Sequence, residues 1–414
     1  MKKSRQLILI VLCWALTSLM YYFNKQSVSV GIDLMYKVLF SIGICGFGAV
    51  CFLFSPNVPR FLILARYFMV YVLPYLLMIW WSLIVWAIDR TSVIYITRGL
   101  STQIYQMIAI LAMVNLLYLF GEKGIWVNLA GMVTANMFII LGIVRQGGFI
   151  AYIEELKTLI LSFGGKTGEM MASAEIHELT FALGVYIAAF LVDFGQLRRH
   201  KILAALALFC FLSGFKRIGI LALFLAVVVG QFLHFFHKKD QALKKLIYMA
   251  SAICTILAFS YLVAVKAGIF TYMSEKYGLD TMGRAEMYAM ISRYYEMSPL
   301  FMGHGTGFVS RLFSDILNID MYAALHNDYL TVYIDVGFVG FFLWIISLAF
   351  TKLRFVMKRQ DTTGWIVLFS ILTYCLVTYA TDNTLNYTYV NAAVAILTIG
   401  RGLMVEETAK QIIA

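Results

Sequence analysis

Long, uninterrupted apolar runs constrain this chain more than any other feature of its sequence. A helix needs about 20 apolar residues to cross the hydrocarbon core of a bilayer. Runs of this kind lie near residues 7–23, 32–54, 61–88, 101–120, 125–144, 176–193, 201–215, 218–236, 246–266, 327–350, 363–380 and 388–404. Because they are continuous rather than alternating, they predict helices and not barrel strands. The expected fold is an all-α polytopic membrane protein with about 12 transmembrane helices, in a single transmembrane domain spanning residues 1–414.

Composition agrees with this fold. Hydrophobic residues make up 62% of the chain and charged residues only 13%, whereas a soluble domain is about 25% charged. The net charge of +11 does not indicate a nucleic-acid partner, because excess Lys and Arg in a polytopic protein usually marks the cytoplasmic loops. Lys2, Lys3 and Arg5 precede the first run and predict a cytoplasmic N-terminus. An even number of spans then predicts that the C-terminus is cytoplasmic as well.

Two connections on the outer side are long. The connection at 146–175 contains an amphipathic segment, FIAYIEELKTLILSF, which we expect to lie in the membrane interface. The connection at 267–326 lies between the ninth and tenth spans and includes the glycine-rich sequence MGHGTGF. Loops longer than about 15 residues are usually functional or disordered. Since this loop is rich in Tyr, Met and Phe, we expect it to be ordered and functional.

Basic residues on the outer side break the expected charge pattern. Lys216 and Arg217 lie in the short turn SGFKRIG between two apolar runs. A guanidinium is costly in that position unless it meets an anion or a water-filled cavity. The alternative is a cation that extends along the helix end to reach water.

Arg284 belongs to a predicted short helix at 283–297. On such a helix Arg284, Tyr288 and Tyr295 share one face and could line a groove, while Arg293 lies elsewhere on its surface. The alternative for Arg284 is a solvated loop arginine paired with a nearby glutamate.

His326 opens the sequence HNDYL, where the long loop re-enters the membrane. An imidazole titrates near neutral pH, so this residue could take a proton from a substrate hydroxyl. The alternative is an interfacial histidine bound to a loop carbonyl. Its neighbour Asn327 is a candidate substrate contact, and His304 is either a further polar contact or a turn residue.

The sequence indicates no metal and no cofactor. Asp315 and Asp320 of the long loop are five positions apart, and no further ligand accompanies them, so a bound Mg²⁺ is not indicated. The six cysteines lie inside apolar runs without a CxxC pair, so they are expected to be packing residues. No P-loop or GxSxG motif is present.

Four elements together resemble the O-antigen ligase/polymerase family, which comprises Wzy-type polysaccharide polymerases and O-antigen ligases. They are the SGFKR sequence ending at Arg217, the pattern R-x-(about 14)-P-L-x-M-G-H-G-x-G from Arg284 to Gly307, LHNDYL at His326, and GFVGF at 337–341. The layout of about a dozen spans, with a large outer loop before the last three, also resembles that family.

The resemblance implies a metal-independent, GT-C-like glycosyltransferase in the bacterial cytoplasmic (inner) membrane. Its donor would be a glycan on undecaprenyl diphosphate at the outer face, and its product an O-antigen, capsule or exopolysaccharide. Arg217 and Arg284 would hold the diphosphate, and His326 would act on the acceptor. The residues that we expect to contact substrate are Lys216, Tyr288, Arg293, His304 and Asn327. The implied partners are the lipid-linked oligosaccharide or polysaccharide, membrane lipid and a chain-length regulator protein, with no nucleic acid and no cofactor.

Three functions compete. The leading one is a polymerase that transfers the glycan to the sugar end of another lipid-linked repeat unit. A ligase would use lipid A–core as acceptor instead. Compared with the ligases, this outer loop is compact and rich in aromatic residues such as Tyr322, which favours a polymerase. A polysaccharide flippase or other transporter would carry acidic residues, broken helices or repeats at the bilayer midplane, whereas the unusual charges here gather at one face.

Overall fold

The computed structural model describes residues 3–23, 32–162, 177–193, 195, 200–278, 281, 283–313 and 325–413. Lys2, Asp315, Asp320 and Tyr322, considered above, lie outside these ranges. Throughout the described ranges the secondary structure is helical, without strands. The all-α prediction is therefore confirmed.

Each predicted apolar run corresponds to a helix. Among the described residues, eight helices are long and apolar enough to cross a membrane. They are α3 (Val58–Asp89), α4 (Val93–Phe120), α5 (Lys123–Gly147), α11 (Arg217–His234), α12 (Asp240–Lys266), the helix Asp328–Met357, α18 (Thr362–Tyr379) and α19 (Thr388–Ile413). Shorter apolar helices cover the other four runs, namely α1 (Lys3–Tyr22), α2 (Ile32–Phe54), α8 (His177–Val192) and α10 (Lys201–Gly214). The chain is thus a multi-pass membrane protein.

The helix Asp328–Met357 is not uniform. It consists of α16 (Asp328–Ile346), a π-helical turn at Ser347–Thr351 and α17 (Lys352–Met357). Inside α16 the backbone leaves helical geometry at Gly337, which has φ 66°. A positive φ of this kind is readily adopted only by glycine, so the glycine at this position permits the kink.

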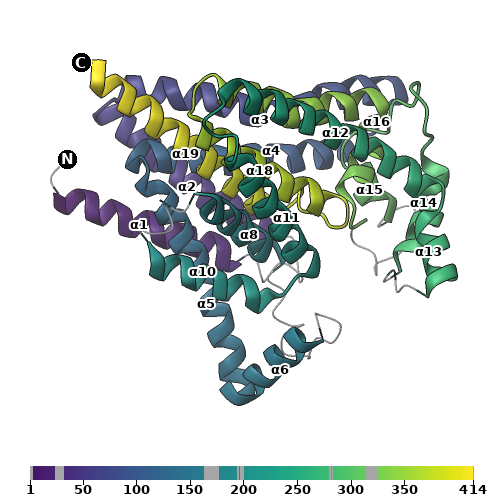
Figure 1. The fold of residues 1–414 in the computed structure, drawn as a ribbon, viewed down its shortest axis with the longest axis horizontal. Coiled ribbons are helices and arrows are strands. Elements are labelled where there is room, and N and C mark those ends of the chain that lie inside the picture. Colours follow the sequence, from purple (N-terminus) through teal and green to yellow (C-terminus); the bar gives the residue numbers. More distant parts are fainter. Residues whose placement is uncertain are drawn as a thin grey trace.

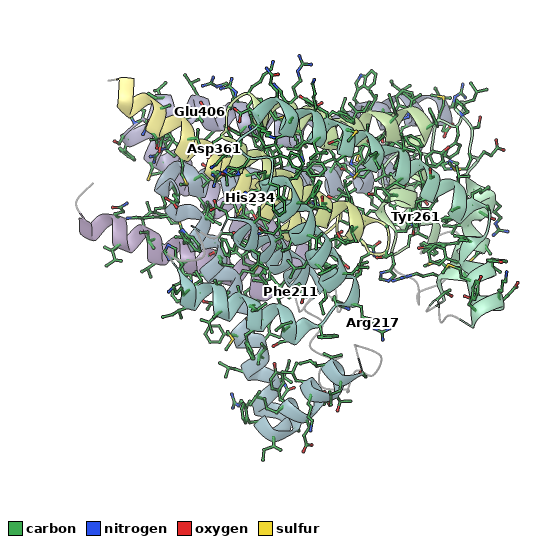
Figure 2. All side chains as sticks on the ribbon, in the orientation of Figure 1. Phe211, Arg217, His234, Tyr261, Asp361 and Glu406 are labelled. Carbon is green, nitrogen blue, oxygen red and sulfur yellow. The ribbon has the colours of Figure 1, made fainter. Side chains whose placement is uncertain are left out.

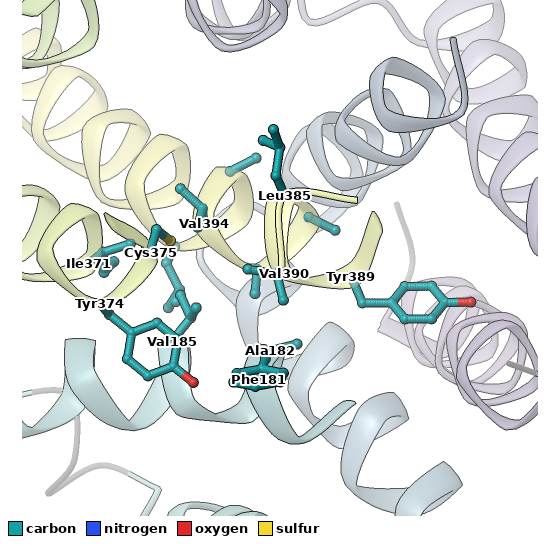
Figure 3. Packing of buried hydrophobic residues seen from close by; sticks show 14 of the residues in the cluster. Phe181, Ala182, Val185, Ile371, Tyr374, Cys375, Leu385, Tyr389, Val390 and Val394 are labelled. Carbon is teal, nitrogen blue, oxygen red and sulfur yellow. The ribbon is translucent and has the colours of Figure 1, made fainter. Parts of the chain in front are cut away.

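The core of the bundle lies where α8 meets α18 and α19. Side chains of α8 such as Phe181 and Val185 face Ile371 and Tyr374 of α18 and Val390 of α19 (Figure 3). The short helix α8 is almost entirely buried, so it packs against protein on all sides rather than against lipid. This packing holds α18 and α19, and therefore the loop between them, in fixed positions.

Charged residues mark the end of the molecule where both termini lie (Figure 1). Here Arg401 of α19 pairs with Asp361 (3.0 Å) and Asp193, Arg60 of α3 pairs with Glu407 (2.6 Å), and Arg359 pairs with Glu406 (3.3 Å). Figure 2 shows Asp361 and Glu406 at this end and Arg217 and Tyr261 at the other. The termini thus share one side, in keeping with the predicted topology; that this side is cytoplasmic remains a prediction.

The long connection forms several short helices at the opposite end. These are α13 (Ile269–Tyr277), α14 (Arg284–Ile291), a 3₁₀ turn at Ser292–Tyr294 and α15 (Phe308–Arg311). The single helix predicted at 283–297 was therefore too long, and Tyr295 is extended. One cause is Lys266, whose Nζ donates to the carbonyl oxygens of Ser292 (2.5 Å) and Tyr295 (2.7 Å). The amphipathic segment of the earlier connection forms a helix of its own, α6 (Phe149–Leu161).

Candidate functional site

The loop of residues 380–387, between α18 and α19, brings together two of the predicted catalytic residues. Arg284 Nη2 donates a hydrogen bond to the carbonyl oxygen of Thr381 (3.0 Å). His326 Nδ1 lies 3.8 Å from Asp382 Oδ1 and 3.3 Å from Asn383 Nδ2. Segments around residues 284, 326 and 382, which are far apart in the sequence, thereby meet at one place. We call Arg284, His326 and Asp382 the His326–Asp382 site.

Polar contacts from α12, α16 and α19 fix this loop. Asp328 is fully buried, and its Oδ2 accepts a hydrogen bond from Leu385 N (2.7 Å). Asn391 of α19 donates to the carbonyl oxygen of Leu385 (2.6 Å), and the Tyr261 hydroxyl donates to that of Ala380. A buried carboxyl oxygen that accepts a backbone N–H is held in place by that hydrogen bond. The loop is thus a positioned element of the site.

Asn327, predicted to contact substrate, is buried instead. Its Oδ1 accepts from Leu330 N (3.0 Å) and caps α16, while its Nδ2 donates to the Tyr261 hydroxyl (3.1 Å). Both ends of the amide are therefore bound within the protein. The geometry gives Asn327 a positioning role directly after His326.

His326 is held in a backbone conformation that favours outward presentation. Its φ is 50°, in the left-handed region that non-glycine residues seldom adopt. The side chain is 49% exposed, whereas that of Asp382 is only 13% exposed. Strain of this kind persists only where surrounding structure imposes it, and it clusters at functional sites. The imidazole therefore faces solvent with a buried carboxylate behind it.

The Asp382 carboxyl is kept ionised. Burial alone would raise its pKa. The nearby His326 lowers it, and so do hydrogen bonds from the backbone N–H of Asn383 and the Tyr387 hydroxyl, so the pKa lies below its usual value. Tyr387 donates to Oδ1 at 2.9 Å and Asn383 N at 2.8 Å. Since the charged form is favoured by its bonds, Asp382 can stabilise a protonated imidazole.

Tyr288, on α14 with Arg284, forms the wall behind the site. It is 4% exposed, and its ring packs edge-on against Phe270 at 5.0 Å. Burial raises the pKa of its hydroxyl, which lies close to Asn327 and Arg284. Tyr288 is thus a neutral, buried phenol rather than an open stacking surface.

Arg217, the third predicted catalytic residue, is the first residue of α11 and is exposed. It lies at the same end of the bundle as Tyr261 (Figure 2), and it has no ion pair with any described residue. Two residues on, a Cβ at Gly219 would lie 3.5 Å from the Phe181 ring, which is 5.9 Å from that of Tyr387. The Phe181 ring therefore lies between the start of α11 and the loop of residues 380–387. Arg217 itself does not contact Arg284 or His326.

The remaining predicted contacts lie apart from the His326–Asp382 site. Lys216 is half-buried at the N-cap of α11. Arg293 is exposed, with its guanidinium 5.0 Å from the ring of Tyr294. His304 Nε2 is bound to the carbonyl oxygen of Tyr294 (2.8 Å), and its ring stacks on Phe308 at 4.1 Å. His304 therefore holds the turn, which was the second of its two predicted roles.

The glycine-rich segment, residues 302–308, docks on α16 and α3. Asp335 of α16 accepts hydrogen bonds from the backbone N–H groups of Gly307 (2.8 Å) and Val309 (3.1 Å). Gly305 has φ 88°, and a Cβ there would lie 1.9 Å from Nε1 of Trp86. Gly303 packs against the kink at Gly337, and a Cβ on Gly303 would lie 2.4 Å from the backbone nitrogen of Gly337. Close backbone approach explains the glycines, so this motif has a structural role.

Asp382, Asn383 and Tyr387 were missed by sequence reasoning. They belong to TDNTLNY, a polar run between two apolar ones, and that interruption was the available signal.

In the described ranges no group of three His, Cys, Asp or Glu side chains could hold a metal ion. All six cysteines are free thiols.

Comparison with known proteins identifies one family. Residues 202–345 match the family model described as O-antigen ligase. The match includes Arg217, Arg284 and His326 and stops before the loop that carries Asp382. No curated protein and no solved structure matches the chain. Residues 202–345 therefore match an O-antigen ligase domain, which is consistent with the O-antigen ligase/polymerase family that the motifs of the chain resemble.

Proposed function

We propose that the protein is a polysaccharide polymerase that transfers a glycan from undecaprenyl diphosphate to the sugar end of another lipid-linked repeat unit. The reaction would take place on the outer face of the bacterial cytoplasmic membrane. The observation that carries the proposal is the meeting of His326, Asp382 and Arg284 at one loop. It combines a base, a charge to support that base and a cation for the leaving group in an O-antigen ligase domain.

His326 would be the general base. The nearby Asp382 carboxylate favours the tautomer with its proton on Nδ1, and the Asn383 amide can turn its oxygen toward the same N–H. Nε2 is then left to accept the proton of the acceptor hydroxyl. The hydroxyl oxygen bonds to the anomeric carbon as the bond from that carbon to the diphosphate oxygen breaks, with inversion. Asp382 stabilises the imidazolium that forms.

Arg284 would stabilise the leaving group. One of its nitrogens is bound to Thr381, which fixes the guanidinium and leaves other N–H groups for phosphate oxygens. Arg217 at the start of α11 would supply a second guanidinium. Guanidinium groups bind oxyanions bidentately and are most effective where negative charge develops. On this proposal the two arginines carry the charge of the diphosphate without a metal ion.

Ligase activity is the second candidate, because the matching family model is described as O-antigen ligase. The two reactions differ only in acceptor. Purified protein incubated with a lipid-linked repeat unit alone should give a ladder of products if it is a polymerase. No product until lipid A–core is added would identify a ligase.

Arginine substitutions and addition of EDTA test the proposed reaction in the same assay. Arg284→Gln and Arg217→Gln should each reduce turnover strongly while the protein remains folded. EDTA should leave the rate unchanged, and strong inhibition by EDTA would contradict the metal-free reaction. A flippase would move lipid-linked glycan across a vesicle membrane without forming any new glycosidic bond.

A further inference from the structure

The C-terminal end of α12 contacts all three segments that form the His326–Asp382 site. Tyr261 and Lys266 lie in the last two turns of this helix, at the end of the bundle where Figure 2 labels Tyr261. Neither residue belongs to the four sequence elements that resemble the O-antigen ligase/polymerase family. Their polar atoms bind the segments that carry Arg284, His326 and Asp382.

The Tyr261 hydroxyl joins two of these segments. It donates a hydrogen bond to the carbonyl oxygen of Ala380, in the loop that carries Asp382, and it accepts one from Asn327 Nδ2 at 3.1 Å. Asn327 follows His326 directly in the chain. A hydroxyl that donates to one segment and accepts from another holds the two at a fixed separation. The distance of 3.8 Å between the imidazole and the Asp382 carboxylate therefore depends on Tyr261.

The Lys266 ammonium holds the third segment. Its Nζ donates to the carbonyl oxygens of Ser292 (2.5 Å) and Tyr295 (2.7 Å), and it lies 4.4 Å from the centre of the Tyr295 ring. Ser292 is the C-cap of α14, the helix that begins at Arg284. A cation beside the last carbonyl groups of a helix stabilises that end of the helix. Lys266 thus fixes α14 against α12, and the guanidinium of Arg284 with it.

We propose that Tyr261 and Lys266 are positioning residues for two separate parts of the transfer reaction, an inference that rests on the function proposed above. Tyr261 sets the contact between the base and its carboxylate, whereas Lys266 sets the cation that binds the diphosphate. Both act through their hydrogen bonds to the protein and not through contact with substrate. Because the two residues hold different segments, substitutions of them should change different measured quantities.

Tyr261→Phe removes the hydroxyl and keeps the ring. Asn327 Nδ2 and the carbonyl oxygen of Ala380 lose a partner, so the rate of glycan transfer should fall about tenfold, as for one buried hydrogen bond. The acid limb of the pH–rate profile should move to lower pH, because an imidazolium held less closely to Asp382 is less stabilised. Inhibition by added undecaprenyl diphosphate, the leaving group of the transfer, should be unchanged.

Lys266→Met should show the opposite pattern. Loss of the ammonium releases the end of α14, so the inhibition constant for undecaprenyl diphosphate should rise about tenfold, the effect of one charge-assisted hydrogen bond. The shape of the pH–rate profile should stay as in wild type. Lys266→Arg retains a cation that can donate to both carbonyl oxygens, and it should restore most of the affinity.

Two matched substitutions control for the loss of a hydroxyl and of an ammonium. The Tyr329 hydroxyl also donates to a carbonyl oxygen of α18, that of Leu376 (2.8 Å), but this bond reaches neither α14 nor the loop of residues 380–387. Lys276 is an exposed lysine of α13 whose Nζ donates to the Tyr272 hydroxyl. Tyr329→Phe and Lys276→Met should leave the transfer rate, the pH–rate profile and the inhibition constant near their wild-type values.

A measurement on His326 itself separates this inference from the proposed reaction. The NMR signal of Cε1 in labelled histidine follows protonation and neighbouring charge, and His326→Ala identifies the signal of this residue. Tyr261→Phe should shift the titration of that signal even if the protein forms no polymer, whereas Lys266→Met should not.

The outcomes are distinct. Absence of polymer from wild type would contradict the proposed function alone. Equal changes in Tyr261→Phe and Tyr329→Phe would overturn the inference, since loss of any buried hydroxyl would then explain them. So would a change of the same quantity, rate profile or inhibition constant, in both Tyr261→Phe and Lys266→Met.

Discussion

Two polar regions at the same end of the bundle differ in how their groups are bonded. In the glycine-rich segment, Asp335 is 4% exposed and accepts two backbone N–H groups. In the His326–Asp382 site, His326 is half exposed and 3.8 Å from its carboxylate. Both carboxyl oxygens of Asp335 are bonded to backbone N–H groups, whereas the imidazole of His326 remains accessible to a ligand. Buried groups that are fully bonded stabilise a fold, whereas a substrate needs groups that are still free to bind it.

The largest effect on glycan transfer is expected from a substitution of His326. His326→Ala should lower the rate of glycan transfer by about a hundredfold to ten-thousandfold, the contribution of a general base. Its melting temperature should stay near that of wild type, because the side chain is half exposed. Product ladders and thermal unfolding in detergent measure the two effects. Wild-type polymer yield from this variant would remove His326 from catalysis.

Gly305→Ala tests the structural region. The new Cβ would lie 1.9 Å from Trp86 Nε1 at a φ of 88°, so strain and steric overlap together should cost about 3 kcal/mol. The expected result is a lower melting temperature and lower yield of folded protein.

Gly148→Ala is the matched control for that substitution. Gly148 has the same φ of 88°, yet a Cβ there meets nothing within 4 Å. It should therefore show only the backbone strain, about 1 kcal/mol. Equal destabilisation by the two substitutions would mean that contact with Trp86 does not matter.

Asp382→Asn should affect chemistry more than folding. Loss of the charge 3.8 Å from His326 Nδ1 should slow transfer by about tenfold, which corresponds to about 1.4 kcal/mol less stabilisation of the imidazolium. The pH–rate profile should change as well, because the imidazolium loses its stabilising partner. A slower enzyme with an unchanged profile would assign Asp382 to loop structure alone.

Acid should weaken the loop through the same carboxyl. The folded-state pKa of Asp382 lies below the ordinary value of 3.8, so the folded protein favours the ionised form. This stabilising contribution is complete above pH 3.8 and is lost as the pH falls through the lower, folded pKa. Thermal unfolding between neutral pH and pH about 3 should show a smaller acid-induced decrease in Asp382→Asn than in wild type.

The smallest effect is expected at Arg293. Its guanidinium lies over Tyr294 and in neither region, so Arg293→Gln should change the transfer rate by less than about twofold, as is usual for exposed cations. Rates measured with the same lipid-linked repeat unit provide the check. A large loss would return Arg293 to the substrate contacts first predicted for it.

Sequence determined the bundle and part of the site. Each of the apolar runs became a helix, because a segment of about 20 apolar residues is most stable as a helix in lipid. The charges that do not follow the basic loops, Arg284 and His326 among them, pointed to the end of the bundle where the site lies. The glycines at 303 and 305 were visible as well, but not the backbone of Gly337 and the Trp86 ring that they approach.

Tertiary structure alone decided which residues meet. Asp382 is far from His326 in the sequence. Only the packing of α8 against α18 and α19 brings the loop between α18 and α19 to the start of α16. The same packing buried Asn327 and turned His304 toward a backbone carbonyl, although both had looked like substrate contacts. Periodicity and hydropathy record how one segment partitions between water and lipid, whereas pairing between distant segments depends on side-chain packing, which neither pattern encodes.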